Sequence, residues 1–334
     1  MAGRIRLASI AILSMALALV PTPTPSGAAV AEACTPTYTP GTLEVHFIDV
    51  GQGNSTLVIA PSGKTMLVDS GERVQALKVA NYLLQTLCTK TIDYFVVSHY
   101  HADHFGSFVE LLRNQGVTVT TATYDRGGGP DEYSSAIYAG YFDFCTTPNP
   151  ADCKRTTIRE LDIIDMGVGI TVTVVCAGDI TTRTSCGETI VSENDNNITL
   201  LVTYDTLDVW IGGDTSGDAA RRSYADVEGA AVALGRVGPT LDVYGVDHHG
   251  SCHSTNDAFV NATVPTVSVF SLGRNSFGHP CPAVVDRLTI AGSATYYTRD
   301  SQGLVVDGDV VVKSAGGTTY TVTGTGGTFT FTTK

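Results

Sequence analysis

The stretch "SHYHADH", residues 98–104, gathers three histidines in a chain of 334 residues that has only eight. His99 and His101 alternate along the chain, so both side chains can point to one metal ion. Asp103 and His104 follow the next turn and can address a second ion. Two metal ions a few ångströms apart share one hydroxide, lower its pKa, and hold the attacking and leaving oxygens of a displacement. The spacing therefore predicts a two-metal site for hydrolysis, here called the cradle, built from His99, His101, Asp103 and His104.

The cradle is expected where a strand ends and a helix begins. "IDYFVVSH" has the pattern of a buried strand, and "DHFGSFVELLRN" begins a helix directly after the cluster. From Leu43 onward strand and helix patterns alternate, and the second half of the chain repeats them. This order favours an α/β fold, an αββα sandwich of two mixed β-sheets packed face to face with helices outside.

The amino end has the pattern of a signal peptide. Arg4 and Arg6 precede an apolar run, 7–20, that is too short to span a bilayer, and Ala-Val-Ala at 29–31 is a cleavage pattern. The sequence thus predicts a secreted, extracellular protein without a stable membrane anchor after processing. The expected divisions are a signal peptide at 1–31, a linker at 32–42, the main domain at 43–300, and a C-terminal β-hairpin extension of the same domain at 301–334.

All eight cysteines lie beyond the expected cleavage point, and none forms a C-x-x-C pair. An even number without zinc-finger spacing favours disulfides over thiolate ligands in an exported chain. The expected pairs are Cys145 with Cys153, Cys176 with Cys186, and, at longer range, Cys252 with Cys281.

The formal net charge is −13. A chain this acidic is not expected to bind nucleic acid through a general basic face. A phosphate substrate would therefore need positive charge supplied locally.

Further motifs accompany the cluster: "FIDVGQGN", "LVDSG", "VWIGGD", "DHHGS" and "FGHP". The H-x-H-x-D-H pattern resembles that of the metallo-β-lactamase superfamily, and the likeness covers nearly all of residues 43–300. The combination of phrases is similar to the β-lactamase-like domain of ComEC competence proteins. The resemblance implies the metal ligands His99, His101, Asp103, His104, Asp214 and His248, supported by Asp69, Asn197 and His249, with Asp103 and His279 acting in catalysis.

Several roles in this set come from the resemblance alone. Asp69 matches an aspartate that steadies the metal loop from behind, and Asp214 matches the aspartate that bridges the two metals. The last ligand is a histidine at a strand end after Asp214, for which His248 is favoured and His249 is the second choice.

Two positions depart from the family pattern. Asn54 stands where ComEC-like chains commonly have aspartate. The third motif usually supplies a histidine some twenty residues before the bridging aspartate, and here Asn196 or Asn197 stands in that region. Two divalent ions, Zn²⁺ or Mn²⁺, are expected. Because an amide oxygen is a weaker ligand than imidazole, the asparagine moves the expected metal preference from zinc towards manganese.

The resemblance implies a metal-dependent hydrolase, most simply a phosphodiesterase or nuclease acting on extracellular DNA, in which a hydroxide activated by two metals attacks phosphorus. His101 supports hydrolysis, because oxygen-reducing diiron relatives carry glutamate there. His279 could donate a hydrogen bond to a phosphate oxygen or a proton to the leaving group. The alternatives are a phosphorylcholine or teichoic-acid phosphodiesterase, and a non-catalytic, metal-stabilised binding module.

Overall fold

Short buried strands from both ends of the chain build the first sheet. The computed structural model describes residues 34–146, 150–220 and 222–334, so the expected signal peptide lies outside the described residues. Strand β16 pairs with β1 and thereby joins the C-terminal hairpins to this sheet. In sheet order its nine strands are β18 (Gly327–Thr332), β17 (Thr319–Gly324), β16 (Val310–Ser314), β1 (Leu43–Phe47), β2 (Thr56–Ile59), β3 (Thr65–Val68), β4 (Thr91–Val96), β5 (Thr118–Asp125) and β6 (Arg155–Thr157).

The second large sheet comes from the later part of the chain. Its seven strands, in sheet order, are β15 (Ala294–Tyr297), β14 (Val267–Phe270), β13 (Leu241–Gly245), β12 (Leu207–Ile211), β11 (Thr199–Tyr204), β8 (Ile170–Cys176) and β7 (Ile163–Ile164). A small hairpin of β9 (Thr184–Ser185) and β10 (Glu188–Thr189) stands apart from both sheets.

Alternating side chains divide the interior into three layers. In β2, Val58 belongs to a core shared by the two sheets, whereas Leu57 and Ile59 pack beneath helices on the other face. In β12, Val209 faces the shared core and Trp210 faces the opposite helices. This period of two is what a strand buried on both faces requires.

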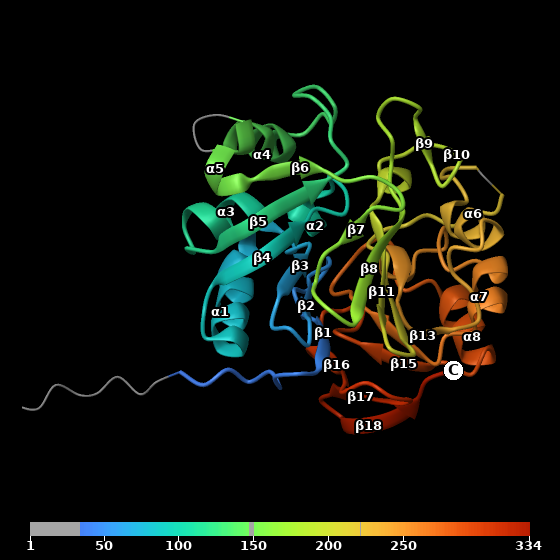
Figure 1. The fold of residues 1–334 in the computed structure, drawn as a ribbon. Helices are drawn as coiled ribbons and strands as arrows, with labels where there is room; N and C mark the ends of the chain where they lie inside the picture. Colours follow the sequence, from blue (N-terminus) through green and yellow to red (C-terminus); the bar gives the residue numbers. More distant parts are fainter. Residues whose placement is uncertain (1–33, 147–149, 221) are drawn as a thin grey trace, which may run out of the picture. The chain divides into compact units, whose positions relative to one another are not determined.

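Helices cover the outer face of each sheet, as Figure 1 shows. The first sheet is covered by α1 (Ala76–Leu87), α3 (Phe108–Arg113) and α4 (Ala136–Thr146), and the second by α6 (Val227–Ala233), α7 (Asp257–Thr263) and α8 (Pro282–Ile290). The short elements are η1 (Arg73–Gln75), α2 (Ala102–Phe105), α5 (Pro150–Cys153), η2 (Asn194–Asn196) and η3 (Asp247–Gly250). The expected αββα sandwich of two mixed sheets is confirmed.

Parallel strand pairs within each sheet bring distant loops together. Strand β3 runs parallel to β4, and β12, β13 and β14 run parallel to one another. The carboxyl ends of parallel strands meet at the same edge, so the loops that follow them become neighbours. The residues expected to bind metal all follow such ends.

The described cysteines form disulfides. The three expected pairs, Cys145–Cys153, Cys176–Cys186 and Cys252–Cys281, are all present, and no described cysteine is free. Among the helices of the described residues, none has the length and apolar character needed to cross a membrane.

Candidate metal centre

One group of candidate ligands joins His99, His101 and Asp214, whose ligand atoms all lie within 4.8 Å of one another. Nε2 of His99 lies 3.0 Å from Nδ1 of His101 and 3.8 Å from Oδ2 of Asp214. Burial and the nearby ring of His104 hold the pKa of His99 well below its usual value. A neutral imidazole is the form that binds metal, so this group can hold a divalent cation.

A second group joins Asp103, His104 and His249. Nε2 of His249 lies 3.4 Å from Oδ2 of Asp103, and Nε2 of His104 lies 4.0 Å from Oδ1 of Asp103. The set of two imidazoles and a carboxylate suits zinc or manganese. The "SHYHADH" segment thus divides between two candidate groups, with His99 and His101 in the first and Asp103 and His104 in the second.

Asp214 lies between the groups, and its two oxygens face different sides. Oδ2 faces His99, whereas Oδ1 lies 3.0 Å from Nε2 of His104 and 3.3 Å from Nε2 of His249. Burial alone would raise the pKa of Asp214, but the imidazoles of His104 and His249 hold it well below the usual value. The carboxylate is therefore ionised and can bridge two cations.

Hydrogen bonds behind the second group fix the direction of each ring. Nδ1 of His104 lies 2.8 Å from Oδ2 of Asp69, and Nδ1 of His249 lies 2.7 Å from the carbonyl oxygen of Ser271. Each Nδ1–H donates to its oxygen, so Nε2 is the nitrogen that each ring turns towards the centre. Asp69 also accepts hydrogen bonds from Ser98, from its N–H at 2.9 Å and its hydroxyl at 2.6 Å.

The loop carrying Asp214 depends on two glycines and Asn197. A Cβ at Gly212 would overlap Oδ1 of Asp247, and Gly213 has a φ of 55° with a Cβ position 2.5 Å from Oδ1 of Asn197. Oδ1 of Asn197 accepts a hydrogen bond of 3.1 Å from the N–H of Asp214, and its Nδ2 donates to the Gly212 carbonyl at 2.6 Å. Asn197 therefore holds the Asp214 loop rather than facing the ligand atoms.

The turn carrying His248 and His249 has an unusual backbone. Their φ values are 50° and 54°, and Gly250 follows with 78°. Left-handed backbone costs energy for residues with a Cβ and persists where the surroundings impose it. The turn sends the two side chains in different directions: His249 enters the second group, whereas His248 stays outside both groups.

Asn194 is a neighbour of the centre that the sequence did not single out. Its Nδ2 lies 3.3 Å from Oδ2 of Asp214 and 3.0 Å from Nε2 of His248. By contrast, Nδ2 of Asn196 bonds outside the groups, to Ser192 and Glu193. Its position in the sequence could have identified it. Asn194 precedes Asp214 by 20 positions, which is the separation at which the family's third motif usually supplies a histidine.

A cavity of about 690 Å³ opens onto both groups. Its walls include His248 and His279, whose rings lie 5.3 Å apart. Burial and the neighbouring histidine His249 lower the pKa of His279 to about 4, and burial lowers that of His248 to about 4. No lysine or arginine lines the cavity among the described residues. Four further wall residues, outside the predicted site set, are Tyr133, Tyr224, His253 and Phe277.

The centre fits divalent cations because ligand atoms converge there without hydrogen-bond partners. Nε2 of His104, Nε2 of His249 and Oδ1 of Asp214 are all buried and unpartnered. Burial would lower the pKa of His104, yet Asp214 and Asp69 raise it well above its usual value. These carboxylates attract positive charge to the rings, and a cation can supply that charge in place of protons.

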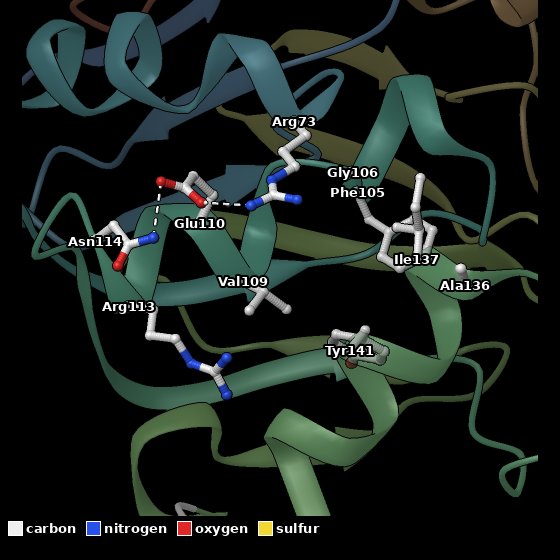
Figure 2. Close-up of a pocket in the computed structure, with 11 residues that line it drawn as sticks. Arg73, Phe105, Gly106, Val109, Glu110, Arg113, Asn114, Ala136, Ile137 and Tyr141 are labelled. Atoms are coloured by element: carbon white, nitrogen blue, oxygen red, sulfur yellow. Dashed lines mark hydrogen bonds and ion pairs between the residues drawn. The ribbon is translucent and has the colours of Figure 1, made fainter.

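Another cavity, of about 340 Å³, lies between α3 and α4 and is shown in Figure 2. None of its lining residues belongs to either ligand group. Its charged groups pair locally: Glu110 accepts hydrogen bonds from Arg73 at 3.4 Å and Asn114 at 2.9 Å. The candidate chemistry therefore belongs to the other cavity.

Comparison with known proteins agrees with this geometry. The family model of the metallo-beta-lactamase superfamily matches residues 48–274. Competence protein ComA of Neisseria gonorrhoeae is 26% identical over 249 residues, 73% of this chain and 29% of that protein. Recombination protein 2 of Haemophilus influenzae is 24% identical over 253 residues, 74% of this chain and 26% of that protein. The chain thus spans less than a third of these two relatives. The metallo-beta-lactamase fold protein YhfI of Bacillus subtilis, a crystal structure, shares 13% identity with a TM-score of 0.46, over 79% of this chain and 99% of that one.

Proposed function

This chain belongs to the metallo-β-lactamase superfamily of metal-dependent hydrolases, and we propose that it is a secreted phosphodiesterase that cleaves extracellular DNA. The observation that carries the proposal is the position of Asp214, whose two oxygens face two separate ligand groups at the wall of an open cavity. The names of two relatives, a competence protein and a recombination protein, support DNA as the substrate. The disulfides are compatible with secretion.

The two groups would hold Zn²⁺ or Mn²⁺. We assign His99, His101 and Asp214 to the first ion, and Asp103, His104, His249 and Asp214 to the second. When bound, such a pair supplies a water of lowered pKa and neutralises the charge that develops on phosphoryl oxygens. The geometry supports His249 as the last ligand, although the sequence favoured His248.

Residues at the cavity wall would orient the reactants. Asp103 is partly buried, which would raise its pKa, but His104 and His249 hold that pKa well below the usual value, so the carboxylate stays ionised. Its carboxylate can accept a hydrogen bond from the attacking water and direct the lone pair towards phosphorus. His279 is neutral at pH 7 and can donate one ring N–H to a phosphate oxygen or to the leaving oxygen.

A phosphorylcholine or teichoic-acid phosphodiesterase is the second candidate. Tyr133, Tyr224 and Phe277 line the cavity, and no described lysine or arginine does. Aromatic rings attract quaternary ammonium groups, and a zwitterion needs no cationic track for neighbouring phosphates. This wall composition favours a small zwitterionic phosphodiester.

A substrate panel tests the proposal. The processed protein, loaded with manganese or zinc, is incubated with plasmid DNA, bis-(p-nitrophenyl) phosphate and p-nitrophenyl-phosphorylcholine. Cleavage of the first two supports the nuclease, and preference for the third supports the esterase. If all three stay intact while metal raises the melting temperature, the chain is a metal-stabilised binding module and the proposal fails. Asp214→Ala should abolish cleavage with the fold intact by circular dichroism, and more than a few per cent of residual activity would contradict its bridging role.

A further inference from the structure

We infer that the side-chain amide of Asn194 is a ligand of the first metal site, and that His248 is thereby left to face the substrate. The inference rests on the proposed function, because it concerns the cation that we place among His99, His101 and Asp214. It adds one oxygen donor to that site.

Asn194 lies next to Asp214, a member of the first ligand group. It is 2% exposed, and its Nδ2 lies 3.3 Å from Oδ2 of Asp214, the same oxygen that faces His99. Asp195 anchors its turn, since Oδ2 of Asp195 accepts backbone N–H groups from Val191 and Ser192, each at 2.8 Å. The amide is therefore held at the site by the backbone of η2, as a ligand needs to be.

Without a cation, the amide of Asn194 has unsuitable hydrogen-bond partners. Nδ2 lies 3.2 Å from Nδ1 and 3.0 Å from Nε2 of His248, although a neutral imidazole has only one nitrogen that accepts a hydrogen bond. Oδ1 of Asn194 is buried and has no hydrogen-bond partner. Buried amide oxygens of this kind are uncommon, because an unmade hydrogen bond is costly inside a protein.

A half-turn of the Asn194 side-chain amide exchanges the positions of Oδ1 and Nδ2. The two ends of an amide have nearly the same shape, so their assignment follows from the surroundings. The rotated side chain places Oδ1 where Nδ2 now lies, beside Oδ2 of Asp214, the oxygen that lies 3.8 Å from Nε2 of His99. Two oxygens so close repel each other unless they share a cation, and oxygen donors of this type bind manganese well.

The resulting site is harder than the usual one of this superfamily. Its donors are two imidazole nitrogens, one carboxylate oxygen and one amide oxygen, with the amide in place of a third imidazole. Exchange of nitrogen for oxygen favours Mn²⁺ relative to Zn²⁺. His248, whose Nε2 lies 3.6 Å from Oδ2 of Asp214, remains at the cavity wall, free to bond a phosphate oxygen.

Metal titration of variants tests the inference without an activity assay. Isothermal titration with MnCl₂ or ZnCl₂, with elemental analysis after dialysis, gives affinity and stoichiometry for each protein. Asn194→Ala should weaken the first site at least about tenfold and leave one ion bound after dialysis. Asn194→Asp, which keeps an oxygen, should retain two ions, and Asn194→His should raise the ratio of zinc to manganese affinity. Asn196→Ala is the matched control, because Asn196 lies in the same turn, is equally buried, and bonds outside the ligand groups.

The outcomes separate this inference from the proposed function. If Asn194→Ala binds two ions with the affinity of the unaltered protein, the amide is no ligand and the inference falls while the two-metal centre stands. If Asn194→His leaves the zinc-to-manganese ratio unchanged, the inference falls in the same way. If the unaltered protein binds no ion, both the proposed function and this inference are wrong. Thermal unfolding of each metal-free variant shows whether the fold survives, and Asn194→Asp carries the test should the alanine variant unfold.

Discussion

Oδ1 of Asp214 lies 3.0 Å from Nε2 of His104, and both atoms are buried. The two atoms converge on the side of the Asp214 carboxylate that faces the second ligand group. The hydrogen bond from Nδ1 of His104 to Asp69 turns Nε2 towards Asp214, whose carboxylate is ionised. A divalent cation satisfies both atoms, which links the fold of this edge to its chemistry.

Metal removal should destabilise the protein. Dialysis against EDTA leaves Asp103, Asp214 and the facing imidazoles without their shared partner. Each cation at a hundredfold excess over its Kd contributes about 2.7 kcal/mol to folding stability. For a domain of this size we expect the Tm to fall by roughly 5–10 °C, measured by differential scanning calorimetry. Added Mn²⁺ should restore the Tm, whereas Mg²⁺ should not; an unchanged Tm after verified metal loss would contradict a structural role for the cations.

Replacement of the two neighbouring histidines should have different effects. His249→Ala removes a member of the second ligand group and should lower the bound metal from two ions to one. His248→Ala removes only a cavity wall residue and should keep both ions while turnover falls, by roughly 10²-fold if the ring bonds the transition state. Elemental analysis and turnover of the same samples decide the matter. Equal metal loss in both variants would show that the turn places the two rings differently.

The disulfide Cys252–Cys281 should matter for both stability and activity. It joins the turn of His248 and His249 to the loop of His279 across 29 positions. The double serine variant should lose about 3–4 kcal/mol of unfolding free energy and also lose turnover, because the two loops become independent. The matched control is the double serine variant of Cys145 and Cys153, a bridge between α4 and α5 that should lose about 2–3 kcal/mol with turnover retained. Equal activity in both variants would argue against a role in positioning.

Glu44 should make stability fall in acid. It is fully buried beside His46 and Lys313, at 2.9 Å from each, and although burial would raise its pKa, these partners lower the pKa to about 2. A depressed carboxyl pKa stabilises the fold above the unfolded value near 4.5, and the contribution is lost as pH falls towards 2. Glu44→Gln should cost up to about 3 kcal/mol at pH 7, and its urea unfolding free energy should converge with that of the unaltered protein between pH 4.5 and pH 2. A difference that stays constant across that range would contradict this role.

Much of the architecture was readable from residue patterns. The buried runs before Asp69, Ser98 and Asp214 predicted strands, and the αββα arrangement follows from their order. The pairs Cys145–Cys153 and Cys176–Cys186 were also predicted, because cysteines so close in the sequence leave few geometries. Periodic burial is a local property, so one sequence is enough to reveal it.

The finer geometry of the centre depends on contacts that no local pattern contains. The choice between His248 and His249 is set by a left-handed turn, and φ cannot be inferred for two consecutive histidines. Asn194 was overlooked because η2 is a single turn with no periodicity, and only its distance of 20 positions from Asp214 pointed to it. Phe277 and Tyr224 line the cavity through loop placement, which depends on tertiary packing rather than on sequence.

The proposed centre has one divalent cation on each side of Asp214. Anomalous diffraction at the manganese edge, from crystals grown with Mn²⁺, measures this directly. Two peaks are expected, one among His99, His101 and Asp214 and the other among Asp103, His104 and His249, with one oxygen of Asp214 facing each. A map without a peak at either position, at full manganese in solution, would contradict it.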